Sequence, residues 1–405
     1  MTHQERIVYG GVDTHEDVHV GAVIDATGRL LGSKAYPTTP IGLRGMLRWM
    51  SGQGTLAMVG VEGTGTYGLG LQRVLQQAGL KVVEVNRPNR QLRRTRGKSD
   101  TVDAEAAARA VLAGHATVVP KARDGIVESI RVLRIALESS RRSRTRVGAQ
   151  IRHLVLTAPE RLHLELAPLP LAEQAARAAR FRPGDDTADV REETRAALRV
   201  LARQYQSLTA DMDLLRAELD TLTTQANPGL RQLRGVGPDT AAALLVAAGD
   251  NPERLTSDAG FAALCGASPV EASSGKTTGH RLNRGGNRQA NAALHRIVVG
   301  RMGHHQPTKD YIARRTAQGK SKKSIMRCLK RYVAREIYSH LVNPRPAEIT
   351  DDLRPRRTAL NIPIRVVALA VGENAMTISR LERGLGHDAE LTRRYHTWIT
   401  HQETA

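Results

Sequence analysis

Residues 7–13 read Ile-Val-Tyr-Gly-Gly-Val-Asp, and residues 56–62 read Leu-Ala-Met-Val-Gly-Val-Glu. Each run is apolar, is typical of a buried strand and ends in a carboxylate, Asp13 or Glu62. Around these two runs, alternating or apolar segments predict further strands at 18–24, 29–35 and 81–85 and helices at 41–50 and 68–78. The stretch therefore predicts an α/β domain with acids at the ends of two strands.

A second pair of carboxylates, Asp100 and Asp103, opens the next expected helix. Three residues apart, they share one helix face, with Cβ atoms about 5–6 Å apart. Mg²⁺ prefers a few carboxylates with open positions for phosphate oxygens and water, and a pair of such ions can hold both oxygens of an in-line displacement. The four acids thus predict a phosphoryl-transfer site. The alternative is that Asp100 caps the helix, Asp103 faces the helix dipole, and the other two are ordinary turn acids.

The composition points to a polyanionic partner. Sixty Lys and Arg against forty Asp and Glu give a net charge of +20 and a pI near 10.7. A membrane is the weaker interpretation, because no apolar run reaches the length of a span and no signal peptide opens the chain. Cys265 and Cys328 are too few for a disulfide framework and are expected to be small buried hydrophobes in a cytoplasmic protein. Aromatic residues make up only 3%, so recognition should depend on Arg and Lys.

Basic residues gather in two places. Residues 87–96 contain five arginines, and residues 309–335 contain ten Lys or Arg and one acid. Both segments are expected to contact nucleic-acid backbone, although a solvated basic loop is the alternative for the first. The residues expected to bind beside the carboxylates are Arg87, Arg90, Arg93, Arg94, Arg96 and Lys98.

Two long helices are expected, at 126–156 and from about 190, joined by a Pro-punctuated connector at 159–170. The second carries apolar residues spaced 3,4,3,4,3,4,3, which is an unbroken heptad seam. The seam favours contact with a partner helix, either in a coiled-coil hairpin or in another subunit. Its members are Leu198, Leu201, Tyr205, Leu208, Met212, Leu215, Leu219 and Leu222.

Three C-terminal segments have their own patterns. Residues 233–241, with Gly-Val-Gly, resemble a helix-hairpin-helix turn whose amides approach phosphate, or form a plain connection. Residues 344–357 read as a linker. Residues 364–372 and 375–384 resemble the helix-turn-helix of phage repressors, with Thr377, Ser379 and Arg380 as candidate contacts, and a plain helical tail is the alternative.

A loop at 266–288 contains Ser273-Ser274-Gly275-Lys276, followed by Arg281, Arg284 and Arg288. A serine in such a Gly-flanked, basic loop could attack a phosphodiester. From the residues alone the signal is weak, because the composition is ordinary for a loop and no partner base is identifiable.

Two sets of motifs resemble one family, the DEDD insertion-sequence transposases, over about residues 7–340. The N-terminal set is Gly11-Val12-Asp13-Thr14-His15, Val61-Glu62-Gly63-Thr64-Gly65, and Lys98-Ser99-Asp100 with Asp103-Ala104. The C-terminal set is Gly266, Pro269, Ser274-Gly275-Lys276 and Arg284-Gly285-Gly286-Asn287-Arg288, with one Gly inserted, which leaves the alignment of the distal arginine open. Glu16 stands where a Lys is common.

The resemblance implies an RNase H-like (RuvC-like) domain at 1–122, a helical coiled-coil region at 123–226 and a mostly α-helical serine transposase domain at 227–343. Residues 344–405, the predicted linker and possible helix-turn-helix tail, lie outside the resemblance. It also implies that Asp13, Glu62, Asp100 and Asp103 are the metal-binding DEDD quartet. Ser274 would be the nucleophile, with Ser273 as the fallback. Lys276, Arg281, Arg284 and Arg288 would bind nucleic acid.

The family implies cutting and rejoining of donor and target DNA through a phosphoserine, with Mg²⁺ at the carboxylates and the serine of one subunit meeting the carboxylates of another. It further implies a structured guide RNA, a homo-oligomer (dimer or tetramer), and a cytoplasmic, nucleoid-associated location. One rival is a RuvC-like nuclease or junction resolvase, which would need the carboxylates but not Ser274. A non-catalytic nucleic-acid scaffold would need neither.

Overall fold

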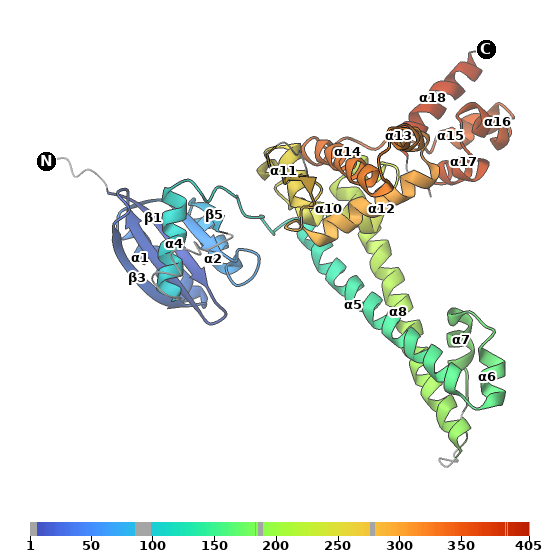
Figure 1. Cartoon of the computed structure of the whole chain (residues 1–405), viewed down its shortest axis with the longest axis horizontal. Coiled ribbons are helices and arrows are strands. Elements are labelled where there is room, and N and C mark those ends of the chain that lie inside the picture. Colours follow the sequence, from blue (N-terminus) through green and yellow to red (C-terminus); the bar gives the residue numbers. More distant parts are fainter. Residues whose placement is uncertain are drawn as a thin grey trace. The chain divides into compact units, whose positions relative to one another are not determined.

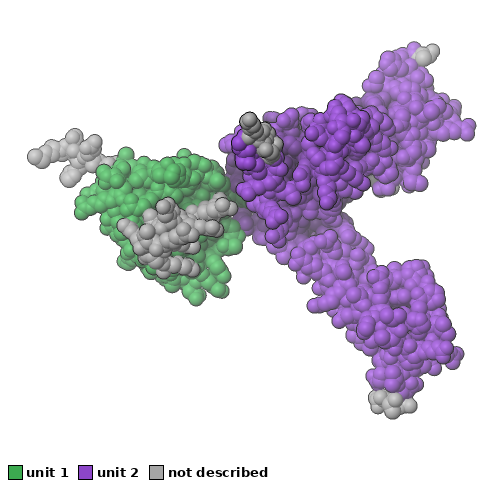
Figure 2. Space-filling view, viewed as in Figure 1, with its two compact units in different colours: residues 1–122 green, residues 123–405 purple. Residues whose placement is uncertain are grey.

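The computed structural model describes residues 6–85, 99–182, 184, 189–275, 280–384, 386 and 388–404. The chain forms two compact units, residues 1–122 and 123–405 (Figure 2). The regions expected at 123–226, 227–343 and 344–405 all fall within the second unit. Among the described residues, none of the helices is both long and apolar enough to cross a bilayer.

Unit 1 is built on a mixed five-stranded sheet of order β3-β2-β1-β4-β5 (Figure 1). The strands are β1 (Ile7–Thr14), β2 (Val18–Asp25), β3 (Leu30–Pro37), β4 (Thr55–Glu62) and β5 (Lys81–Val85). The first three run antiparallel as a meander, whereas β1, β4 and β5 run parallel. The strands predicted from the sequence are confirmed to within one or two residues at each end.

Helices cover both faces of this sheet. The elements α1 (Pro40–Ser51) and α2 (Leu69–Gln77) share a core with Val8 and Val12 of β1. On the other face, α4 (Asp100–Leu112) packs its Ala107 against Val83 and Val85. Because side chains alternate along a strand, the residues of β1 that face α4 are those out of phase with Val8 and Val12. Asp13 is one of them.

Two glycines bring α4 down onto the sheet. A Cβ added at Gly11 would collide with the backbone of Ala104 and Ala108 in α4. A Cβ at Gly60 of β4 would lie only 2.6 Å from a side-chain methyl of Val111 in the same helix. The helix can approach because both strands lack side chains where it crosses them. This close contact fixes the height of α4 above the strand that carries Asp13.

Unit 2 begins with a long helical hairpin, in which α5 (Ile126–Thr157) and α8 (Val190–Ala226) lie side by side (Figure 1). The core at one end joins Ile130 to Leu219, and the core at the other joins Val155 to Leu198, so the two helices run antiparallel. The heptad seam is therefore buried or half-buried against α5 of the same chain. The partner helix that the seam predicted is thus supplied within the chain, by α5.

The predicted connector at 159–170 is wrong in part. It contains α6 (Glu160–Leu166), and α7 (Leu171–Ala178) follows directly. Leu162 and Leu166 of α6 are buried in the core that α5 and α8 form. The prolines that read as breakers are the residues that precede these helices, Pro159 and Pro170.

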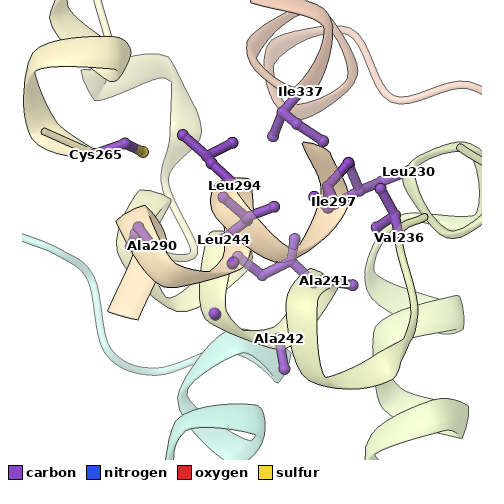
Figure 3. Packing of buried hydrophobic residues seen from close by; sticks show 14 of the residues in the cluster. Leu230, Val236, Ala241, Ala242, Leu244, Cys265, Ala290, Leu294, Ile297 and Ile337 are labelled. Carbon is purple, nitrogen blue, oxygen red and sulfur yellow. The ribbon is translucent and has the colours of Figure 1, made fainter. Parts of the chain in front are cut away.

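A globular helical body follows the hairpin. Its core surrounds the helix at Pro238–Ala248 (α10), whose alanines and leucines are all buried, and includes Leu244, Ile297 and Ile337 (Figure 3). Cys265 is buried as predicted, and burial raises the pKa of its thiol to about 12, whereas Cys328 is only half-buried. The elements are α9 (Pro228–Arg231), α10 (Pro238–Ala248), η1 (Pro252–Arg254), α11 (Asp258–Leu264), β6 (Val270–Glu271), β7 (His280–Arg281), α12 (Arg288–His304), α13 (Gln306–Ala317) and α14 (Lys322–Val342).

The last four helices enclose a small core of their own, around Ile378 and Tyr395. They are α15 (Leu353–Ala359), α16 (Ile364–Ala370), α17 (Ala375–Glu382) and α18 (Ala389–Glu403). The predicted linker is wrong at its C-terminal end, because α15 begins inside it and buries Leu353. Its N-terminal part is hydrogen-bonded to the body, where Gln232 and Glu348 exchange two hydrogen bonds.

Candidate active site

Asp13 and Glu62 lie at the carboxyl ends of neighbouring parallel strands. In the register of β1 and β4, Val12 pairs with Val61, so the two acids are the next residues on each strand. The Thr14 hydroxyl donates a hydrogen bond of 2.8 Å to the backbone carbonyl of Glu62, which ties the two strand ends together. Asp13 is buried and Glu62 half-buried. The sheet therefore places both predicted acids at one edge.

The other two predicted acids enter from α4. Ser99 caps this helix, because its hydroxyl accepts from the Val102 N–H. The alternative role of Asp100 as the cap is therefore wrong. Asp100 and Asp103 occupy the first turn, Asp100 exposed and Asp103 buried. Their turn faces Asp13, since both carboxylates act electrostatically on it.

His15 joins this group, and sequence reasoning missed it as a site residue. Its Nε2 lies 3.1 Å from Oδ2 of Asp13 and 3.4 Å from Oδ1 of Asp100. Ligand atoms of these three residues lie within 4.8 Å of one another. The sequence did carry a local signal for the contact with Asp13, because a histidine two residues beyond a strand-end aspartate can turn back towards it. Asp13, His15 and Asp100 form what we call the donor cluster.

Burial raises the pKa of Asp13 above its ordinary value. His15 opposes this shift through its charge and hydrogen bond, while Asp103 and Asp100 add to it. A buried carboxylate beside two more acids is stabilised by a cation that neutralises the group. Oxygen donors with one imidazole suit a divalent ion, so the donor set fits such a metal.

Ser274 lies on a short hairpin in the other unit. In the described part of this hairpin, β6 and β7 pair through Val270–Arg281 and Glu271–His280. Ser273 and Ser274 are both exposed, and Gly275 has a φ of +53°, which favours glycine. The arginines expected to bind nucleic acid here, Arg281, Arg284 and Arg288, are exposed as well.

The base of this hairpin is packed against α12, and the two adjacent glycines there, Gly285 and Gly286, differ in their surroundings. A Cβ at Gly286 would collide with the backbone of Gly266, whereas a Cβ at Gly285 would meet only the Asn283 side chain, at 3.5 Å. Asn291 of α12 donates hydrogen bonds to the carbonyls of Cys265 and Gly266. Of the two adjacent glycines, Gly286 is the one that the packing requires.

Several predicted contacts remain expectations. Residues 86–98 and 276–279 lie outside the described residues, so Arg87, Arg90, Arg93, Arg94, Arg96, Lys98 and Lys276 are not placed. In the helix-hairpin-helix-like turn, Gly235 lies against Ile297 of α12, while Gly237 is open.

One side of the expected recognition helix, α17, faces the helical body and not solvent. Its Thr377 and Arg380 line a cavity of about 480 Å³ together with Gly300 and His304 of the body. In the turn before α17, Glu373 forms an ion pair of 2.6 Å with Arg234. The helix-turn-helix interpretation therefore stays a prediction, with one side of α17 turned to the body.

Two regions of the chain match known families. Residues 10–158 match the model of a DEDD transposase family and contain all four predicted acids. Residues 228–313 match the transposase IS116/IS110/IS902 family and contain Ser274. The protein is thus an enzyme of the transposase and recombinase class that acts on DNA.

More particularly, the chain carries two transposase domains of the IS110 family. The mixed five-stranded sheet of unit 1 is consistent with an RNase H-like domain. The DEDD-type domain and the donor cluster together indicate a divalent metal. No curated protein matches the sequence.

Proposed function

We propose that this transposase cuts and rejoins DNA through a serine-phosphodiester intermediate, with the nucleophile in unit 2 and a metal site in unit 1. The observation that carries the proposal is the donor cluster, where Asp13 and Asp100 meet at the edge of the sheet with His15 between them. The supporting observation is Ser274, which is exposed on a hairpin beside exposed arginines.

The metal that we propose is Mg²⁺, held by Asp13 and Asp100 with Glu62 and Asp103 as further carboxylates. When bound, it would supply positive charge that polarises the scissile phosphate. The protein's own part is to hold the carboxylates ready. Burial of Asp13 and Asp103 restricts their side chains, and the contact of α4 with Gly11 fixes the distance between helix and sheet.

In the proposed step, Oγ of Ser274 attacks the scissile phosphorus. A bond forms between Oγ and phosphorus, and the bond from phosphorus to the 3′ oxygen breaks. The serine proton passes to solvent, and the leaving 3′ oxygen takes up a proton. Because the phosphodiester energy is kept in the phosphoserine, attack by a 3′ hydroxyl can rejoin DNA without a nucleotide cofactor. Arg281, Arg284 and Arg288 would hold the backbone.

The partners that we propose are donor and target DNA, a structured guide RNA, and further copies of the chain in a dimer or tetramer. The net charge of +20 supports polyanionic partners. In the assembly, the serine of one subunit would act with the carboxylates of another. We place the protein in the cytoplasm, at the nucleoid.

The test is strand cleavage with Asp13→Asn, which keeps the shape of the side chain and removes its charge. We expect cleavage to fall by more than about 100-fold. Mutation of a group that only hydrogen-bonds to a metal ligand already costs about 10–100-fold, and loss of the ligand itself should cost more. The matched control is Asp25→Asn at the end of β2, where the side chain accepts hydrogen bonds from a turn, as an amide oxygen also can.

Cleavage by Asp13→Asn at the wild-type rate in Mg²⁺ would contradict the metal-site assignment. Normal cleavage by Ser274→Ala, together with loss in Asp13→Asn, would instead support the metal-dependent nuclease or junction resolvase. Retained folding in both variants is checked by thermal melting.

A further inference from the structure

A cavity of about 500 Å³ opens between α12, α13 and α14, outside both proposed sites. Its buried lining includes the apolar side chains of Val298, Leu329 and Val333. Tyr311 and Tyr332 also line it, with ring centroids 5.6 Å apart and an interplanar angle of 79°. The volume lies in the range of pockets that enclose a small planar molecule.

The rim of the cavity is aromatic and cationic. Tyr332 is 54% exposed, so much of its ring is open to a ligand. The Arg314 guanidinium lies 5.5 Å from the centre of the Tyr311 ring, and in the part of the chain that the structure describes it has no carboxylate partner. The surrounding segment adds exposed cations, which are Lys309, Lys320, Lys322, Lys323 and Arg327.

The inner end of the cavity is polar but already neutral. Arg301 and Glu336 line it and form an ion pair of 2.7 Å. Arg301 also donates to the backbone carbonyl of Arg234. These groups do not call for a charged ligand, yet they offer donors and acceptors to the edge of one. The cavity therefore suits a flat, uncharged ring with polar edges, attached to an anionic chain that meets Arg314.

We propose that this cavity takes an unpaired nucleobase, stacked on Tyr332, while the adjoining phosphate is held by Arg314. An unpaired base is the ligand that joins a π-face and polar edges to an anionic chain. A base within a duplex has its faces covered by its neighbours and cannot enter. With so few aromatic residues in the chain, this is one base site and not an extended platform. The inference rests on the proposed function only in taking nucleic acid as the partner.

The test compares binding of short labelled oligonucleotides by the full-length protein, by fluorescence anisotropy at fixed salt and without divalent metal. Tyr332→Ala should weaken binding of single strands about tenfold, the effect of losing one stacked base. Duplex of the same sequence should bind within about twofold of wild type. Tyr332→Phe keeps the stacking ring and should bind single strands normally.

Two controls separate a base site from general electrostatics. Lys320→Ala removes an exposed charge of the same segment, and it should weaken single strands and duplex alike. A strand that lacks bases should bind the wild-type protein as weakly as an ordinary strand binds Tyr332→Ala. Tyr332→Ala should not weaken the binding of this baseless strand any further. Separate DNA and RNA strands show which nucleic acid supplies the base, and a loss with either supports the proposal.

Two results would overturn the proposal. One is that Tyr332→Ala weakens duplex and single strands equally, and the other is that it weakens neither the DNA nor the RNA single strand. The outcome is independent of cleavage, because binding is measured without divalent metal and Tyr332→Ala should weaken single strands by the same factor in the Asp13→Asn background. If cleavage chemistry were assigned wrongly, the binding difference would persist. If the base site were assigned wrongly, the effect of Asp13→Asn on cleavage would persist.

Discussion

The donor cluster and the serine hairpin are built in opposite ways. Asp13 is 7% exposed, at the end of a strand paired on both sides and covered by a helix that lies directly on the sheet. Ser274 is exposed, on a hairpin whose two strands pair through two residues each. Asp13 and Asp103 are buried between the sheet and α4, whereas Ser274 is exposed on a loop whose base packs against α12.

The difference follows from the chemistry proposed for each. A metal site must hold several oxygens at set distances before the ion binds, which favours rigid elements. A nucleophile that attacks a large duplex substrate must be reachable, which favours a projecting loop. The two regions should therefore fail differently on mutation. Small changes of packing should destroy the cluster, and the hairpin should be sensitive mainly where its base is packed.

The largest expected effect is at the cluster. Gly11→Ala should lower cleavage about 100-fold, because the new methyl pushes α4 and its two acids away by a fraction of an ångström or more. It should also cost about 1–3 kcal/mol of unfolding free energy. Cleavage kinetics and thermal melting measure both effects.

Gly10→Ala is the matched control for this change. Its methyl would lie 3.2 Å from the sulfur of Met50 and 3.3 Å from a methyl of Val59, both on the face of the sheet that is turned away from α4. Cleavage should stay within about threefold of wild type, since the strain falls on the face opposite the carboxylates. Equal activity of the two variants would show that the height of α4 does not control the site.

A smaller effect is expected at the base of the hairpin. Gly286→Ala should slow DNA cleavage about tenfold, because its methyl displaces the backbone of Gly266, from which the loop of Ser274 departs. Gly285→Ala should be nearly neutral. Cleavage rates of the two variants, with melting temperatures as a check on folding, measure the difference. A reversed order would mean that Gly285, not Gly286, is the glycine that the packing requires.

The sequence predicted the sheet because its signals were local. Apolar strands that end in Asp13 and Glu62, and a helix opened by Asp100, need no tertiary information. His15 was missed because its role depends on where α4 brings Asp100, which no periodicity encodes. The contact at Gly11 was missed for the same reason, since a glycine in a strand gives no sign of what approaches it.

In unit 2 the failures arose from ambiguous signals. Pro159 and Pro170 read as breakers, although proline is also common at the start of a helix, and here each directly precedes one. The heptad seam identified a partner helix but not its chain, and α5 supplies it within the molecule. In α5, the Arg144 guanidinium lies 5.7 Å from the centre of the ring of Tyr205, so a cation and not an apolar side chain meets the seam there.

Ser274 is the nucleophile that we propose for strand transfer. Denaturing electrophoresis of labelled DNA after reaction with wild type, Ser274→Ala and Ser273→Ala tests this role. We expect a covalent protein–DNA adduct, bonded to serine, with the wild type and with Ser273→Ala. With Ser274→Ala we expect neither adduct nor recombinant product, although that variant still binds DNA. Cleavage without an adduct in any lane would contradict the serine mechanism, and loss of the adduct only in Ser273→Ala would move the nucleophile by one residue.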